Sequence, residues 1–147
     1  MKVFLIRHGQ ASPADVDPEK GLSRDGRTEV GQLSNLLREE EVDRIFHSGK
    51  ARAEQTAEIL AEGLGLDSPM EKTGLMPNDD VMTIAGYLEF EEENVMLVGH
   101  LSFMDVLANV LLPGNDKDPF SIPTATAIIL EKREGEWHLI ALLSPNF

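Results

Sequence analysis

The apolar residues of this chain alternate between two spacings, and this alternation restricts the possible folds more than any other feature. Short continuous apolar runs at residues 3–6, 45–46 and 95–98 are typical of buried strands. Between and after these runs, apolar residues recur at intervals of three and four, which predicts amphipathic helices covering residues 30–37, 53–64, 81–88 and 103–111. Strand–helix alternation of this kind predicts an α/β fold, a three-layer sandwich with a mainly parallel sheet and helices on both faces.

The C-terminal part of the chain follows a different pattern. The segment ATAIILEKREGEWHLIALL predicts two strands joined by a tight turn near Glu134–Gly135, which would form an antiparallel hairpin. Ser23 and Ser102 precede two of the predicted helices and are expected to be their N-caps. Since no repeat or Gly/Ser/Pro-rich linker divides the chain, we expect residues 1–147 to form a single domain.

Each of the three apolar runs ends on polar residues that a buried strand does not need. The first run ends on Arg7, His8 and Gly9, the second on His47 and Ser48 with Arg52 shortly after, and the third on Gly99 and His100. Because the carboxyl ends of parallel strands lie on one edge of a sheet, and ligands bind at that edge, these residues are expected to line one cleft. Two helix N-termini would open onto the same cleft.

Such a cleft is suited to a small, multiply charged anion, and phosphate fits best. Guanidinium groups bind phosphate oxygens in bidentate fashion, and helix N-termini offer free N–H groups. We expect Arg7, Arg52 and His100 to bind the anion, and Gly9 to let the backbone approach it without a Cβ. Ser48 is expected either to cap the following helix or to contact the phosphate. His47 is expected to be structural, and His138, in the hairpin, to face solvent.

Composition excludes several other functions. The absence of cysteine rules out disulfides, thiolate metal sites and cysteine nucleophiles. A net charge of −13 argues against nucleic acid as a partner. No segment approaches the ~20 apolar residues of a membrane span, and the N-terminal apolar run is too short for a signal peptide, so we expect a cytoplasmic protein that does not bind membranes. The oligomeric state is left open.

Four segments resemble the motifs of the histidine phosphatase superfamily, which has the phosphoglycerate-mutase-like fold. They are LIRHGQA, LSRDGR, SGKARAEQTAEIL and LVGHLSFM, and the resemblance covers residues 2 to about 112. The short length and the segment GLMPNDD look most like the SixA-type phosphohistidine phosphatases. Ala14 stands where the mutase branch has asparagine, and the glutamate acid of larger members has no obvious counterpart.

The resemblance implies that His8 is the nucleophile and forms a phosphohistidine intermediate, with Arg7, Arg52 and His100 stabilising the transferred phosphoryl group. It implies neither a metal nor a cofactor. The charges of the two arginines should favour the neutral, nucleophilic form of His8, and His100 would be a third cation when protonated. Asp79 and Asp80 are candidates for a general acid, or alternatively they cap a helix.

The expected activity is removal of phosphate from phosphohistidine in a partner protein. An imidazole leaves readily once its nitrogen is protonated, so this substrate tolerates a site with a weak general acid. The alternatives are a broad-specificity small-molecule phosphomonoesterase, a non-catalytic phosphate-binding module and, with less support, a metal-dependent phosphatase.

Overall fold

A six-stranded sheet forms the centre of the molecule. The computed structural model describes residues 1–114 and 122–147. The strands are β1 (Lys2–Arg7), β2 (Arg44–His47), β3 (Met70–Glu71), β4 (Val95–Gly99), β5 (Thr126–Arg133) and β6 (Glu136–Leu143), in the order β3-β2-β4-β1-β5-β6. The first four strands are parallel, whereas β5 runs antiparallel to β1 and β6 antiparallel to β5. This confirms the predicted parallel sheet with a C-terminal antiparallel hairpin.

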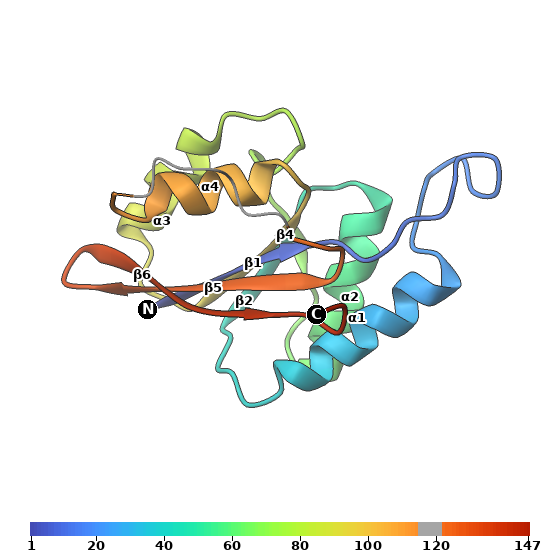
Figure 1. The fold of residues 1–147 in the computed structure, drawn as a ribbon, viewed down its shortest axis with the longest axis horizontal. Helices are drawn as coiled ribbons and strands as arrows, with labels where there is room; N and C mark the ends of the chain where they lie inside the picture. Colours follow the sequence, from blue (N-terminus) through green and yellow to red (C-terminus); the bar gives the residue numbers. More distant parts are fainter. Residues whose placement is uncertain (115–121) are drawn as a thin grey trace.

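The helices cover both faces of the sheet, as the sequence predicts. One face carries α1 (Arg24–Leu36) and α2 (Ala51–Leu64), and the other carries α3 (Val81–Phe90) and α4 (Phe103–Leu111) (Figure 1). The three strands at the centre are therefore buried on both sides. This explains why their sequences are continuous apolar runs and do not alternate with polar residues.

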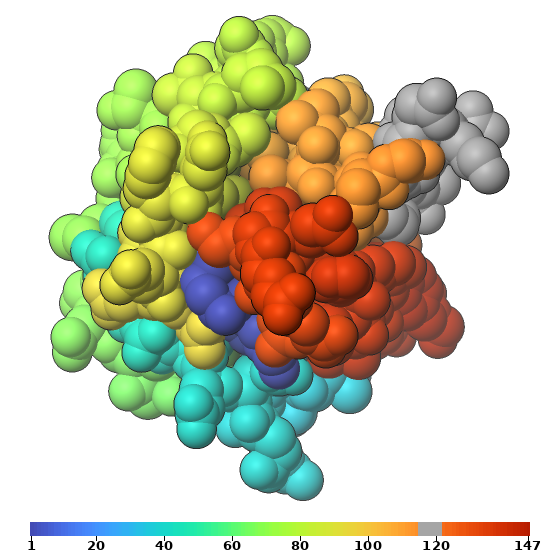
Figure 2. Space-filling model, turned by 90° about the vertical axis from the view of Figure 1, so that its left-hand side faces the viewer, coloured from blue at the N-terminus to red at the C-terminus, as the bar shows by residue number. Residues whose placement is uncertain are grey.

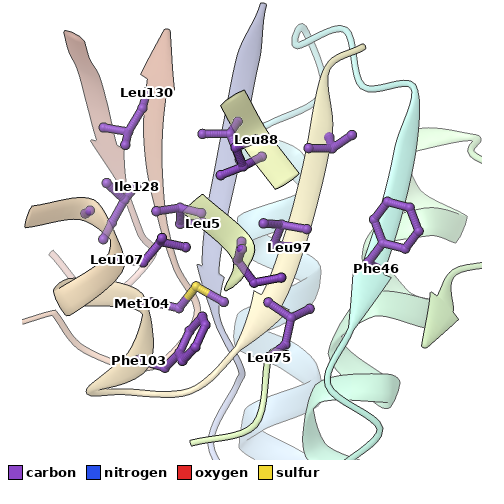
Figure 3. Packing of buried hydrophobic residues seen from close by; sticks show 14 of the residues in the cluster. Leu5, Phe46, Leu75, Leu88, Leu97, Phe103, Met104, Leu107, Ile128 and Leu130 are labelled. Carbon is purple, nitrogen blue, oxygen red and sulfur yellow. The ribbon is translucent and has the colours of Figure 1, made fainter. Parts of the chain in front are cut away.

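Alternate residues of β1 belong to different halves of the core. Val3 and Leu5 pack in the cluster beneath α3 and α4, and Phe4 and Ile6 pack in the cluster with α1 and α2. Figure 3 shows the first cluster, in which strand residues face side chains of the two helices, among them Leu88, Phe103, Met104 and Leu107. These four residues have no exposed surface, so β1 is buried on both faces up to Arg7.

The structure differs from the sequence prediction in two details. The short strand β3 was not predicted; both of its residues are exposed, so no apolar spacing indicates it. Ser23 caps α1 as expected, with its Oγ accepting the Gly26 N–H at 2.9 Å. Ser102 occupies the predicted N-cap position of α4, but its side chain makes no capping hydrogen bond. The Val106 N–H donates to the Ser102 carbonyl at 3.1 Å and to the Asp105 carboxylate at 2.9 Å.

The parallel register aligns the carboxyl ends of β1, β2 and β4 on one edge of the sheet. Arg7 is paired with Gly99, and His47 with Val98. The opposite edge carries the N-terminus, the residues after α3 and the β5–β6 turn, and Figure 2 faces this side. Among the described residues, no helix is long and apolar enough to cross a membrane.

Candidate active site

The two predicted histidines lie next to each other at the carboxyl edge of the sheet. His8 directly follows β1, and its N–H donates to the Gly99 carbonyl at 3.0 Å, so the β1–β4 pairing fixes its backbone. The His8 and His100 ring centroids are 5.2 Å apart, with ring planes inclined at 61°. Arg52 lies in the first turn of α2, as predicted, and its charge acts on both imidazoles. Residues separated by more than 90 positions therefore share one site.

His8 has the protonation state that a nucleophile requires. Its Nδ1 lies 2.6 Å from the Gly9 carbonyl oxygen. Since a carbonyl can only accept, Nδ1 carries the proton and Nε2 keeps its lone pair. Burial, and to a lesser degree the charges of Arg52 and Arg7, lower the pKa of His8 to about 4, so the ring is neutral at pH 7. The arginines act in the predicted direction, but burial has the larger effect.

His100 is also neutral. Only 2% of the residue is exposed, and burial, followed by repulsion from a protonated His8 and from the charges of Arg52 and Lys50, lowers the pKa of His100 to about 3. The third cation considered from the sequence is therefore absent from the free site. The His100 Nε2 lies 2.7 Å from the Ser48 Oγ, whereas its buried Nδ1 has no hydrogen-bond partner among the described residues.

Further donors at this edge lack acceptors. Arg7 donates from Nη1 to the Ile122 carbonyl at 2.6 Å, but its buried Nε has no partner within the described part of the chain. The same holds for the hydroxyl of Thr126, the residue paired with Arg7 across β1 and β5. In residues 1–114 and 122–147, the Arg52 guanidinium has no acceptor either. Buried donors without acceptors are uncommon, and a cluster of them is typical of a site that receives an anion.

Close packing against α1 is one reason why position 9 requires glycine. A Cβ at this position would lie 2.6 Å from Val30 Cγ2 and 3.0 Å from the Gly26 carbonyl oxygen, so the glycine allows close packing against α1. Its N–H donates to Thr56 Oγ1 at 3.0 Å and is already satisfied. Whether Gly9 contacts substrate stays a prediction.

Sequence reasoning missed the role of Thr56. This fully buried residue accepts the Gly9 N–H and donates to the Arg52 carbonyl at 2.8 Å, so it connects the segment after His8 to the turn carrying Arg52. The only available signal was its place in the RAEQTA motif. Glu29 was also missed. Its carboxylate accepts from the Gln10 N–H at 2.6 Å and the Thr124 hydroxyl at 2.8 Å, which no local pattern indicates.

The two candidate acids cap local structure. The Asp80 side chain accepts the Met82 N–H at 2.9 Å as N-cap of α3, and Asp79 accepts the Met76 N–H at 2.9 Å. Both residues are exposed, and neither hydrogen-bonds to the histidines or arginines of the site. Asp80 therefore caps a helix, as the alternative interpretation predicts, whereas Asp79 holds the loop before α3; a catalytic role for either stays a prediction.

The remaining candidates are Ser48, His47 and His138; whether Ser48 contacts phosphate stays a prediction. The N-cap of α2 is Lys50, not Ser48, although the Ser48 Oγ accepts the Lys50 N–H at 3.3 Å. His47 is buried and its Nδ1 accepts the Gly49 N–H at 3.1 Å, in agreement with the expected structural role. His138 is exposed, as expected. A hollow of about 420 Å³ between α3, α4 and the hairpin contains none of the histidines or arginines of the site.

This arrangement defines a class of chemistry. A neutral imidazole with a free Nε2 lies at the same edge as two arginines and a second imidazole, and among the described residues Arg7 Nε and His100 Nδ1 have no hydrogen-bond partner. Phosphoryl transfer depends on such a combination of positioning and electrostatic stabilisation. Among the described residues, no group of three or more histidine, aspartate or glutamate side chains is placed to hold a metal ion.

Comparison with known proteins identifies the family. Residues 3–76 match the family model "Histidine phosphatase superfamily (branch 1)". The chain is 30% identical over 140 residues to the phosphohistidine phosphatase SixA of Escherichia coli K12, with 90% of this chain and 87% of the relative covered. The chain belongs to the histidine phosphatase superfamily and is a phosphatase of the SixA-like type.

Solved structures agree with this assignment. A structure of the protein histidine phosphatase SixA complexed with tungstate superposes with a TM-score of 0.89 at 29% identity, covering 99% of this chain and 98% of that one. A putative phosphohistidine phosphatase SixA from Agrobacterium tumefaciens superposes with a TM-score of 0.77 at 26% identity, covering 98% and 97% of the two chains. These similarities confirm the predicted family and fold.

Proposed function

We propose that this phosphatase removes the phosphoryl group from phosphohistidine in a partner protein, through a phosphorylated intermediate on His8. The observation that carries the proposal is the neutral His8, with Nδ1 held by the Gly9 carbonyl at 2.6 Å, near the buried Arg7 Nε and His100 Nδ1, which have no hydrogen-bond partner among the described residues. The relatives named phosphohistidine phosphatase support the choice of substrate.

In the proposed reaction the His8 Nε2 lone pair attacks phosphorus. The bond to the substrate imidazole breaks, and its electron pair stays on the leaving nitrogen, which a proton neutralises. Arg7, Arg52 and His100 stabilise the charge on the equatorial oxygens. Water then attacks phosphorus, and the bond to His8 breaks with its electron pair returning to Nε2. Inorganic phosphate leaves with the protons of the water.

The substrate preference follows from the absence of a positioned acid. Among the described residues, no carboxyl group donates to or accepts from His8 or His100. An alkyl phosphate needs a proton donor for its alkoxide, a contribution of about 10²–10⁴-fold in rate, whereas a protonated imidazole leaves without one. The site is therefore better suited to a phosphoramidate than to an ester.

The test compares dephosphorylation rates on phosphohistidine-bearing proteins with those on a panel of small phosphate esters. We expect turnover of phosphohistidine to be faster by at least tenfold. Efficient cleavage of sugar phosphates together with inactivity on phosphohistidine would refute the proposal. A variant with both Asp79 and Asp80 replaced by asparagine, which can still cap a helix, tests the phosphomonoesterase alternative. That alternative predicts that the variant loses activity on aryl phosphates but not on phosphohistidine.

A trapping experiment separates catalysis from simple phosphate binding. The wild-type protein should carry acid-labile, base-stable radiolabelled phosphate after rapid quenching, and the His8→Ala variant should carry none. The matched control is His138→Ala, which removes an exposed imidazole and should label like wild type. Binding of phosphate without labelling of the wild type would instead indicate a non-catalytic module.

A further inference from the structure

The hydrogen bond between Ser48 and His100 can have either direction, depending on which ring nitrogen of neutral His100 carries the proton. Ser48 is 3% exposed and His100 2%, and the distance of 2.7 Å between Oγ and Nε2 is a short hydrogen bond. Either the serine donates to a bare Nε2, which leaves the proton of the neutral ring on Nδ1, or a protonated Nε2 donates to the serine, which leaves Nδ1 bare.

The hydrogen bonds around Ser48 favour the first arrangement. The Lys50 N–H donates to the serine oxygen at 3.3 Å, so this oxygen already accepts one hydrogen bond. Nε2 of His100 is the one acceptor within hydrogen-bond distance of the hydroxyl among the described residues. If Nε2 carried the proton, the buried hydroxyl would have no acceptor, at a cost that buried polar groups rarely bear.

The chemistry of the site favours the same arrangement. The His100 ring lies 5.2 Å from the His8 ring, where a phosphoryl group on His8 would be a close neighbour. A protonated Nδ1 would be a donor without an acceptor among the described residues, and an anionic oxygen would supply one. A bare Nδ1 would instead present a lone pair to that anion and repel it.

We propose that Ser48 is a positioning residue that holds neutral His100 in the tautomer with the proton on Nδ1, so that the ring is a hydrogen-bond donor to the transferred phosphoryl group. In this arrangement the Lys50 N–H, before α2, donates to the Ser48 oxygen, and the Ser48 hydroxyl donates to Nε2 of the His100 imidazole. Ser48 then acts through His100 and does not itself contact the substrate. The proposal rests on the function proposed above, because it assigns a direction to a hydrogen bond that the phosphatase reaction needs.

The primary test is nitrogen NMR of the imidazole rings at pH 7, in protein labelled with ¹⁵N-histidine. We expect the wild-type His100 spectrum to show a protonated Nδ1 and an unprotonated Nε2. In Ser48→Ala the signals should move toward the opposite tautomer or an average of the two. Ser34→Ala is the matched control, because Ser34 is also a buried serine but lies in α1, away from the histidines; it should leave the His100 signals unchanged.

The second readout is kinetic. Loss of one preorganised donor costs up to about 10²–10³-fold in rate, and partial population of the correct tautomer reduces that loss, so we expect kcat for Ser48→Ala to fall by about tenfold with little change in KM. Ser48→Thr keeps the hydroxyl and should restore the Nδ1-protonated spectrum. A wild-type spectrum with the proton on Nε2, or an unchanged tautomer in Ser48→Ala, would overturn the proposal.

These outcomes remain separate from the test of the proposed function. The NMR measurement on the wild type decides the tautomer even if Ser48→Ala does not fold. A wild type with the expected tautomer but no phosphohistidine turnover would contradict the function alone. A wild type that turns over phosphohistidine with the proton on Nε2 would contradict only the role of Ser48.

Discussion

The replacement of Gly26 by alanine tests whether the close contact between α1 and the segment after His8 holds the site. Gly26 lies inside α1, where alanine is ordinarily more stable than glycine by about 0.5–1 kcal/mol. A Cβ there would lie 2.1 Å from the Gln10 carbonyl oxygen and 3.0 Å from both the Gln10 carbonyl carbon and nitrogen. Because all three are backbone atoms, no side-chain rotation relieves the overlap.

The expected magnitude follows from this geometry. Ordinary contact begins near 3.4 Å, so the chain must move by roughly 1.3 Å. The Gln10 carbonyl also accepts the Ser23 N–H at 2.9 Å, which opposes the movement. Overpacking typically costs about 1–3 kcal/mol, and the large overlap here places the cost at the upper end of that range. The higher helix propensity of alanine offsets part of this cost, so we expect a net loss of about 2 kcal/mol in the free energy of unfolding. For a chain of this size the melting temperature should fall by about 4–8 °C.

Gly31→Ala is the matched control, since it makes the same substitution in the same helix where a Cβ meets nothing within 4 Å. It should raise the stability by about 0.5–1 kcal/mol. Urea unfolding followed by fluorescence of Trp137, the single tryptophan, measures both variants. Gly26→Ala should also lower kcat, because Gln10 is two residues from His8 and small displacements of reacting groups are costly. Equal stability of the two variants would refute the reasoning.

Three further predictions follow from the site. Thr56→Val leaves the buried Gly9 N–H without an acceptor and should cost about 1–3 kcal/mol in urea unfolding, whereas Thr56→Ser should be close to wild type. Burial lowers the pKa of His8 to about 4 and of His100 to about 3, so below pH 6.5 the unfolded chain binds protons that the native protein does not. As the pH is lowered from 6.5 to 5, the free energy of unfolding should therefore fall by roughly 1 kcal/mol per pH unit for each of the two histidines. If a variant without both imidazoles showed the same dependence on pH, this reasoning would be wrong. Asp80→Ala removes the N-cap of α3 and should lower the melting temperature by an amount equivalent to about 1 kcal/mol, and Asp80→Asn should not.

The elements that the sequence predicts correctly are those with a strong repeating signal. The apolar runs at residues 3–6 and 95–98 are buried on both sides, so every residue is apolar, and the helices bury one face at regular intervals. The turn at Glu134–Gly135 has positive φ at both residues, 51° and 81°, which the glycine signals. The exposed strand β3 buries nothing and has no such signal.

The membership of the site was also predictable, because parallel strands end on a common edge. That rule placed His8, His100 and Arg52 together from their positions after strands and in a first helical turn. It specifies where a backbone ends, however, and says nothing about which hydrogen bonds the side chains make there. For this reason Ser48 was assigned either to a helix cap or to phosphate, and its bond to His100 was not foreseen.

The amino-acid sequence by itself therefore determined the layers of the fold, the strand ends and the residues that meet there, because these depend on periodicity and chain direction. Only the tertiary structure decided the protonation of the histidines, the need for glycine at positions 9 and 26 and the role of Thr56. The physical reason is that burial, contact distance and hydrogen-bond partners are set by groups far apart in the chain, whose separation appears only once the three layers have packed together.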